Sequence, residues 1–204
     1  YTEELADLDR REDLDDLFQL IGVNYQESQS RSAVAAFASR FPWLVANIAG
    51  GLVAAFLSGL FRDELERAVA LAMFIPVVLA LAESVSIQSV SIALQRLHGG
   101  RPTVAGLLRD IRRELATGFL LGGAAASVVT IVALSWLGQG PVVLALLGGI
   151  TGGVTAAAVI GLAIPNMLRL LAREPQVAAG PISLAATDMV TLTVYLCLAR
   201  WLLG

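Results

Sequence analysis

The chain has 204 residues, of which 56% are hydrophobic and only 15% are charged, and its mean hydropathy is +0.73. This composition excludes an ordinary soluble domain and indicates an integral membrane protein. The formal charge is −3, all 14 basic residues are arginine, and no basic face is available for nucleic acid. With one cysteine and one histidine, the chain by itself cannot form a Cys/His metal site or catalytic pair.

Residues 1–40 are the only clearly polar part of the chain. Leucines recur near one helical face in the first half of this stretch, and residues 32–39 resume a short amphipathic pattern. We therefore predict an N-terminal helical segment, without the basic and apolar pattern of a signal peptide. Its carboxylates form either a solvated face or a vestibule that concentrates divalent cations: Asp7, Asp9, Glu12, Asp13, Asp15 and Asp16.

Five apolar segments follow, each long enough to cross a bilayer, which takes about 20 helical residues. They comprise 41–61, 68–97, 114–137, the stretch after the tight turn 138–141, and 175–203. The predicted fold class is an all-α integral membrane protein with five transmembrane helices per subunit and a short N-terminal cytoplasmic helical segment.

The second apolar segment carries an acid and a polar stripe. Pro76 removes a backbone donor and is expected to loosen the helix, and Glu83 is a carboxylate at membrane depth. Four polar residues fall within about 60° on a helical wheel: Ser84, Gln88, Ser91 and Gln95. Glu83 is offset from this stripe, so it either lies at the rim of a polar path or pairs with an arginine from a neighbouring loop.

Small residues recur at four-residue spacing in the third and fourth segments, a pattern typical of helices that pack closely in membranes. The repeats comprise Gly118, Gly122 and Ala126, then Gly148/Gly152 and Gly149/Gly153. This pattern predicts tight packing rather than chemistry. Pro165 is expected to break the fourth helix near its end.

The last segment is the main candidate for function because it carries Asp188 near its middle. An acid at that depth is tolerated mainly beside a polar cavity, a partner or an ion. Five polar residues fall within about 140° on a helical wheel and give the helix one polar side: Ser183, Thr187, Asp188, Thr191 and Tyr195. The alternative is a buried, protonated aspartate that hydrogen-bonds to a neighbouring helix.

The arginines predict the orientation of the chain. Most lie before the first segment or in the loops after the second and fourth segments. By the positive-inside rule, the N-terminus is expected in the cytoplasm and the C-terminus on the external, periplasmic side.

Several motifs resemble the transmembrane domain of the MgtE-type magnesium transporters and channels. They are FPWL at 41–44, the run 76–88, Arg113-Glu114-Leu115, GLAIPNMLRLL at 161–171 and, most specifically, AAGPISLAATDMVTLTVYL at 178–196. The resemblance implies a non-enzymatic homodimer in a bacterial inner (plasma) membrane, with spans two and five lining a cation path on the two-fold axis. It also implies that residues 32–40 form a linking, plug-like helix and that 41–204 form the ion-conducting domain.

By the same resemblance, Asp188 corresponds to the family acid that binds Mg²⁺ in the pore. Helical geometry adds the carbonyl of Leu184 one turn earlier, and the hydroxyls of Thr187 and Thr191 are candidates to contact the hydration shell of the ion. In span two, Gln88 is the retained residue of the family pattern. Glu83 stands where the family commonly has glycine, so the sequence departs from the family there.

Mg²⁺ holds its waters tightly and prefers oxygen ligands, so carboxylates, hydroxyls and carbonyls suit the hydrated ion. We therefore predict divalent cation transport, with magnesium as the bound and transported ion, through a channel-like homodimer. The absence of soft ligands disfavours zinc and copper, while manganese, cobalt and calcium stay open. Three alternatives remain: a proton-coupled transporter or exporter in which Glu83 titrates, an intramembrane aspartyl protease using Asp188 and Glu83, and a non-transporting scaffold.

Overall fold

A computed structural model describes residues 32–98, 103–138, 140–171 and 175–203, and within these ranges every regular element is a helix. The helices are α2 (Ala33–Leu60), α3 (Arg62–Arg67), α4 (Val69–His98), α5 (Val104–Leu137), α6 (Gly140–Leu170) and α7 (Pro175–Leu203). The predicted all-α class is confirmed. The acidic stretch 1–31 lies outside the described residues.

Within the described part of the chain, four helical stretches are long and apolar enough to cross a membrane: Val69–Leu97, Val104–Leu137, Gly140–Leu170 and Ala179–Leu203. Helix α2 contains a shorter apolar stretch, Asn47–Leu60. The structure is therefore that of a membrane-type helical bundle, and the fifth span stays a prediction.

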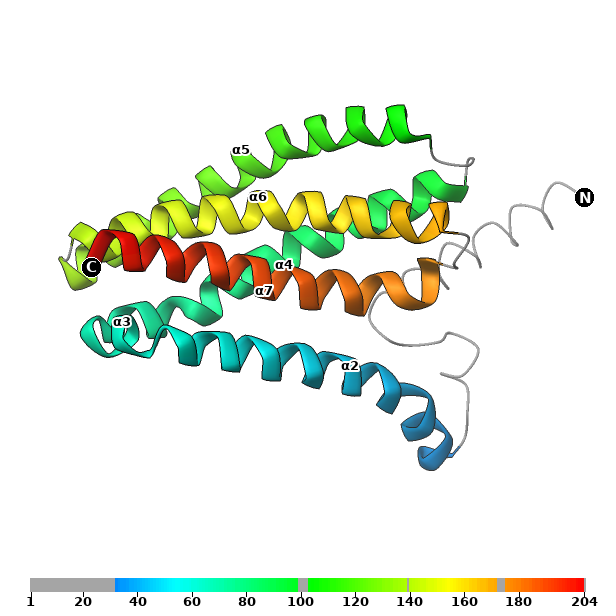
Figure 1. Cartoon of the computed structure of the whole chain (residues 1–204), viewed down its shortest axis with the longest axis horizontal. Helices are drawn as coiled ribbons and strands as arrows, with labels where there is room; N and C mark the ends of the chain where they lie inside the picture. Colours follow the sequence, from blue (N-terminus) through cyan, green and yellow to red (C-terminus); the bar gives the residue numbers. More distant parts are fainter. Residues whose placement is uncertain (1–31, 99–102, 139, 172–174, 204) are drawn as a thin grey trace, which may run out of the picture.

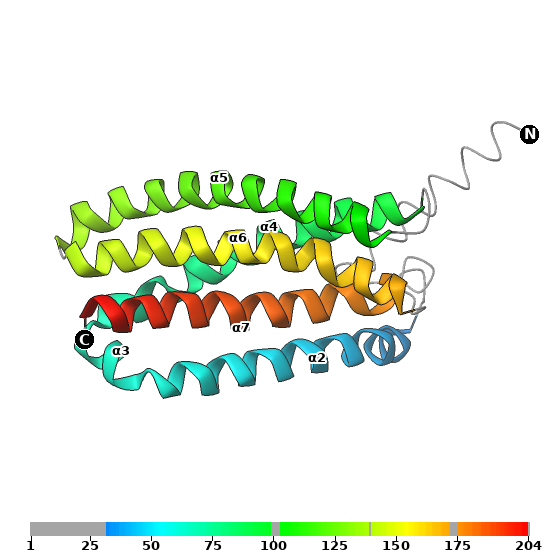
Figure 2. The ribbon, with the colours of Figure 1, turned by 45° about the horizontal axis from the view of Figure 1, so that its top comes forward.

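Helix α6 lies at the centre of the bundle. It packs against α4, α5 and α7, and α7 additionally contacts α4 and α2. Figure 1 shows α5, α6, α7 and α2 side by side, with α4 crossing behind α6 and α7, and the turned view in Figure 2 keeps this order. The two helices with intramembrane acids, α4 and α7, are therefore direct neighbours.

Glycines allow the central helices to approach closely, as the four-residue repeats predict. A Cβ atom at Gly122 of α5 would lie 2.8 Å from the carbonyl oxygen of Thr151 in α6. A Cβ atom at Gly153 of α6 would lie 2.6 Å from the side chain of Thr191 in α7. Such distances leave no room for a larger residue, so the repeats confirm their predicted role in packing.

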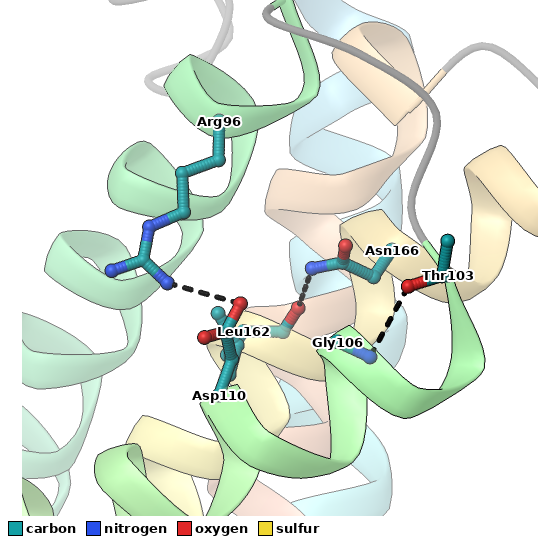
Figure 3. Close-up of polar contacts among 6 residues, drawn as sticks. All are labelled: Arg96, Thr103, Gly106, Asp110, Leu162 and Asn166. Atoms are coloured by element: carbon teal, nitrogen blue, oxygen red, sulfur yellow. Dashed lines mark hydrogen bonds and ion pairs between the residues drawn. The ribbon is translucent and has the colours of Figure 1, made fainter.

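Two helices extend beyond the predicted bounds. Helix α2 begins at Ala33 and continues through the boundary expected at 40/41. Helix α5 begins at Val104, ten residues before the expected start of the third span, and Thr103 caps it by accepting a hydrogen bond from the amide of Gly106 at 3.2 Å (Figure 3). The amphipathic stretch before the third span is thus continuous with the span itself.

The prediction that Pro165 breaks the fourth helix is wrong, because α6 continues to Leu170. Next to this proline, the side-chain amide of Asn166 donates a hydrogen bond to the carbonyl of Leu162 at 2.7 Å (Figure 3). Prolines are tolerated in membrane helices where side chains and neighbouring helices compensate for the lost backbone bond. The bond that Pro165 removes is the one to the carbonyl of Gly161, so the Asn166 contact is an additional bond in the same turn and does not replace it.

The core consists of two apolar clusters with polar residues between them. The larger cluster includes Leu71 and Val78 of α4, Leu146 of α6 and Leu196 of α7. The smaller one joins Val90, Leu94 and Leu97 of α4 to Ala179 of α7. Five buried hydroxyl residues, here called the polar layer, belong to α4 and α7: Ser86, Ser89, Ser183, Thr187 and Thr191. This layer adjoins the candidate site.

Candidate ion site

The polar layer joins α7 to its neighbours through hydroxyl groups. Thr187 donates a hydrogen bond to the Oγ of Ser86 at 3.0 Å, and both residues are fully buried. Thr191 donates to the carbonyl oxygen of Gly153 in α6 at 3.5 Å. The hydroxyl of Ser183 is also buried and has no partner among the described residues. Most of the predicted polar side of α7 therefore faces α4 and α6 inside the subunit.

Asp188 adjoins this layer and is only half-buried. Its Oδ1 atom is buried and has no hydrogen-bond partner within the described ranges. The carboxyl group of Glu83 in the neighbouring helix α4 lies close to the carboxyl group of Asp188. The structure thus brings together the two intramembrane acids that the sequence analysis singled out separately.

Two neighbouring carboxyl groups inside an apolar bundle form an arrangement in which two negative charges are unfavourable without a partner. Like charges at short range repel, and the repulsion is relieved by a cation between them or by a proton on one of them. Among the described residues, no arginine forms an ion pair with Glu83, and no cluster of three or more His, Cys, Asp or Glu side chains occurs. One subunit therefore supplies two carboxylates, and any further ligands must be neutral oxygens, water or groups from another copy.

The remaining candidate residues divide into two groups by their exposure. Leu184 is half-buried one turn before Asp188, whereas Gln88 lies on the exposed surface of α4 together with Ser84 and Gln95. Ser91 is half-buried and donates to the carbonyl of Ile87 in its own helix at 2.9 Å. The predicted stripe on α4 is therefore largely an outward face of the single subunit, on a different side from the polar layer.

A second contact fixes α7 against α4 nearer the C-terminal end. Tyr195 is fully buried and donates from its hydroxyl to the carbonyl oxygen of Leu71 at 3.1 Å. Its ring fits against α6 because position 149 is glycine, and a Cβ atom there would overlap the ring. Thr187 and Tyr195 thus hold α7 on α4 at two levels, and Asp188 lies between them in the chain.

Sequence reasoning missed the residues that support this site. Ser86 and Ser89 lie outside the wheel stripe counted on span two, yet each forms a hydrogen bond to another helix. Their spacing of three residues, which places both on one helical face, is the signal that identifies them. Glu114, the partner of Ser89, belongs to the motif Arg113-Glu114-Leu115 at the predicted start of the third span.

Comparison with known proteins shows which family the chain resembles. A family model named MgtE and described as a divalent cation transporter matches residues 75–198. This stretch runs from α4 to α7 and contains both carboxylates of the candidate site.

Three curated relatives carry the name magnesium transporter MgtE. The protein of Bacillus subtilis (strain 168) is 29% identical over 175 residues, covering 83% of this chain and 38% of the relative. That of Enterococcus faecalis is 26% identical over 97% of this chain and 44% of the relative. That of Thermus thermophilus is 28% identical over 99% of this chain and 45% of the relative.

The chain therefore spans less than half the length of these curated relatives. The family match covers more than half of this chain and agrees with the membrane-type helical bundle. The chain belongs to the MgtE family of divalent cation transporters.

Proposed function

We propose that this chain forms the membrane part of a divalent cation transporter and that magnesium is its principal cargo. The observation that carries the proposal is that Asp188 and Glu83 lie close together on the packed helices α7 and α4, with the Oδ1 of Asp188 buried and without a partner among the described residues. Relatives named magnesium transporters support the choice of ion. Family membership also favours transport over the protease and scaffold alternatives.

The conducting unit in this proposal is a homodimer with five spans per subunit, α2 serving as the first span. A single subunit exposes Ser84, Gln88 and Gln95 on α4. Polar side chains that face lipid are unfavourable, so such residues usually face a partner or a water-filled path. A second copy packed on this face encloses them and places α4 and α7 of both copies around one path. The arginine distribution orients the N-terminus toward the cytoplasm.

The chemistry follows from how Mg²⁺ is hydrated. The ion keeps most of its waters, so the site binds it mainly through water-mediated contacts. Asp188 and Glu83 supply negative charge, while the carbonyl of Leu184 and the amide oxygen of Gln88 accept hydrogen bonds from the water shell. Clustered carboxylates favour a divalent over a monovalent cation because only the former offsets their mutual repulsion.

Thr187 and Thr191 have a different role in this proposal. Their hydroxyls already donate to Ser86 and to the carbonyl of Gly153 inside the subunit. We therefore assign them to holding α7 in place, and the ion contacts to the four residues above.

Growth of a magnesium-auxotrophic bacterial strain tests the proposal. We expect the wild type to restore growth at low magnesium, Asp188→Asn to abolish it and Glu83→Gln to weaken it. Asp63→Asn is the matched control, because Asp63 is an exposed acid in the short helix α3. Full rescue by Asp188→Asn, at equal amounts of protein in the membrane, contradicts the proposal.

The same carboxyl contact favours a second candidate function, a proton-coupled transporter or exporter. Two neighbouring carboxyl groups can share one proton, and in this candidate a cation that enters displaces it. Ion flux that disappears when the pH gradient is removed supports this candidate, whereas flux driven by the cation gradient alone supports a channel.

A further inference from the structure

A hydrogen bond joins α4 to α5, two helices that otherwise touch only sparsely. Ser89 of α4 donates from its Oγ to the Oε1 of Glu114 in α5 at 2.6 Å. Helix α5 packs mainly along α6, as Figures 1 and 2 show. Ser89 is buried and Glu114 is half-buried. A carboxylate acceptor makes this contact one of the stronger kinds of hydrogen bond.

The contact depends on a close approach of α4 to α6 at the same level. A Cβ atom at Gly161 of α6 would lie 2.9 Å from the Cβ of Ser89 and would overlap the carbonyl oxygen of Ser86. The backbone of α4 therefore lies directly on α6 at this point. From this position Ser89 reaches Glu114 on α5, while Ser86 receives its hydrogen bond from Thr187 on α7.

These two serines lie on the side of α4 opposite the exposed stripe. At about 100° per residue, the pair Ser86/Ser89 is rotated about 150° from the pair Ser84/Gln88. The exposures agree with this, since Ser86 and Ser89 are 0% and 2% exposed, and Ser84 and Gln88 are exposed. Any rotation of α4 about its axis therefore moves both faces together.

Apolar packing by itself sets the rotation of α4 only weakly. Apolar residues surround this helix on its buried and exposed sides alike, for example Val78 inside and Val77 outside. Lipid tails are as apolar as these side chains, so burial offers little preference between rotations in a membrane. Close packing at Gly161, the interhelical hydrogen bonds of Ser86 and Ser89, and the bond from Tyr195 to the carbonyl of Leu71 are contacts that favour one rotation over another.

We propose that Glu114 is a positioning residue for the ion path. Through Ser89 it holds the rotation of α4 that keeps Glu83 against Asp188 and Gln88 on the outer face. The inference rests on the proposed function, because it assigns Glu114 an effect on ion binding at a site it does not touch. Ser89 donates the hydrogen bond and Glu114 accepts it. Glycine at position 161 leaves the room that α4 needs to lie this close to α6.

Mg²⁺ flux into proteoliposomes tests the proposal, measured across a range of Mg²⁺ concentrations for the full chain. We expect Ser89→Ala and Glu114→Ala each to raise the half-saturating Mg²⁺ concentration about threefold to tenfold, which corresponds to loss of one interhelical hydrogen bond. The double variant is expected to match Glu114→Ala, since both changes remove the same bond. Glu114→Gln keeps an acceptor for Ser89 and is expected to stay within about twofold of wild type.

Two matched controls separate this bond from the general effect of deleting a hydroxyl. Thr117 and Ser127 lie on α5 with Glu114, but both are exposed, and each donates to a carbonyl of its own helix, at 3.1 and 2.7 Å. Thr117→Ala and Ser127→Ala are expected to leave the half-saturating concentration unchanged. If Glu114→Ala does not yield monodisperse protein, the comparison of Ser89→Ala with Thr117→Ala decides the question.

Three results overturn the inference: a Ser89→Ala curve that coincides with Thr117→Ala, single effects that multiply in the double variant, or a loss of maximal rate with no change in half-saturation. Failure of the proposed function gives a different pattern. In that case the wild type itself carries no Mg²⁺, or Asp188→Asn transports like wild type. Normal Ser89→Ala together with an inactive Asp188→Asn rejects the positioning role alone.

Discussion

Thr187 of α7 and Ser86 of α4 are joined by a hydrogen bond of 3.0 Å in the buried polar layer of the bundle. Asp188 is the next residue along α7, and successive helical residues project about 100° apart. Because Thr187 is bonded to α4, Asp188 lies at the edge of the interface between α4 and α7, close to Glu83. A hydroxyl contact that binds no ion thus determines where the candidate ion site lies.

Removing this hydroxyl is expected to loosen α7. Thr187→Val keeps the shape of the side chain and leaves Ser86 without its donor. We expect a loss of about 0.5–1.5 kcal/mol in the free energy of unfolding, the usual range for one interhelical hydrogen bond. Thermal unfolding in detergent measures it. Thr193→Val is the control, because Thr193 is exposed and bonds within its own helix at 2.7 Å; equal effects of the two changes contradict the expectation.

Gly161→Ala is expected to separate α4 from α6. The new methyl group would overlap the backbone oxygen of Ser86, which cannot move away as a flexible side chain can. Overpacking of this kind destabilises by about 1–3 kcal/mol. The yield of monodisperse protein and its unfolding temperature measure the loss. Gly123→Ala, with nothing within 4 Å of its Cβ position, should leave both unchanged.

The proposed dimer predicts that Gln88 lies near its counterpart in the second copy. In a Cys197→Ser background, Gln88→Cys is expected to form covalent dimers with a short thiol-reactive cross-linker in membranes. Leu120→Cys is the control, because Leu120 is 72% exposed on α5, outside the face of α4 that the proposed dimer encloses. Cross-linking that is equal at both positions, or strongest at position 120, contradicts the assignment of α4 to the dimer interface.

The ion pair between Arg96 and Asp110 is expected to matter little for stability. The two side chains lie 3.3 Å apart (Figure 3) and are 45% and 34% exposed. Exposed pairs of this kind contribute less than about 1 kcal/mol and are screened by salt. Asp110→Asn should therefore change the unfolding temperature by less than Thr187→Val does. A larger effect that persists at high salt contradicts this reading of the pair.

The sequence allowed prediction of those features that depend on periodicity along one helix. The stripe on α4 was predicted from spacing alone, and Ser84, Gln88 and Gln95 do lie exposed on one face. The glycine repeats of α5 and α6 likewise mark the contacts with Thr151 and Thr191. Helical geometry fixes which residues share a face, so such patterns are readable without a structure.

What the sequence could not show is which neighbour each face meets. Thr187 and Thr191 were grouped with Asp188 as one polar side, yet both threonines are fully buried against other helices. These polar residues span about 140° around the helix. Such a wide sector includes Thr187, which contacts another helix, and Asp188, which lies at the edge of the interface. The contact of Glu83 with Asp188 depends on how α4 crosses α7, which periodicity within either helix does not encode.

The most direct test of the central claim is Mg²⁺ flux into proteoliposomes that contain either the wild-type chain or Asp188→Asn at equal protein density. The substitution keeps the size of the side chain and removes its charge. We expect saturable Mg²⁺ entry for the wild type and none above protein-free vesicles for Asp188→Asn. Equal entry for the two proteins contradicts the claim that Asp188 binds the transported cation.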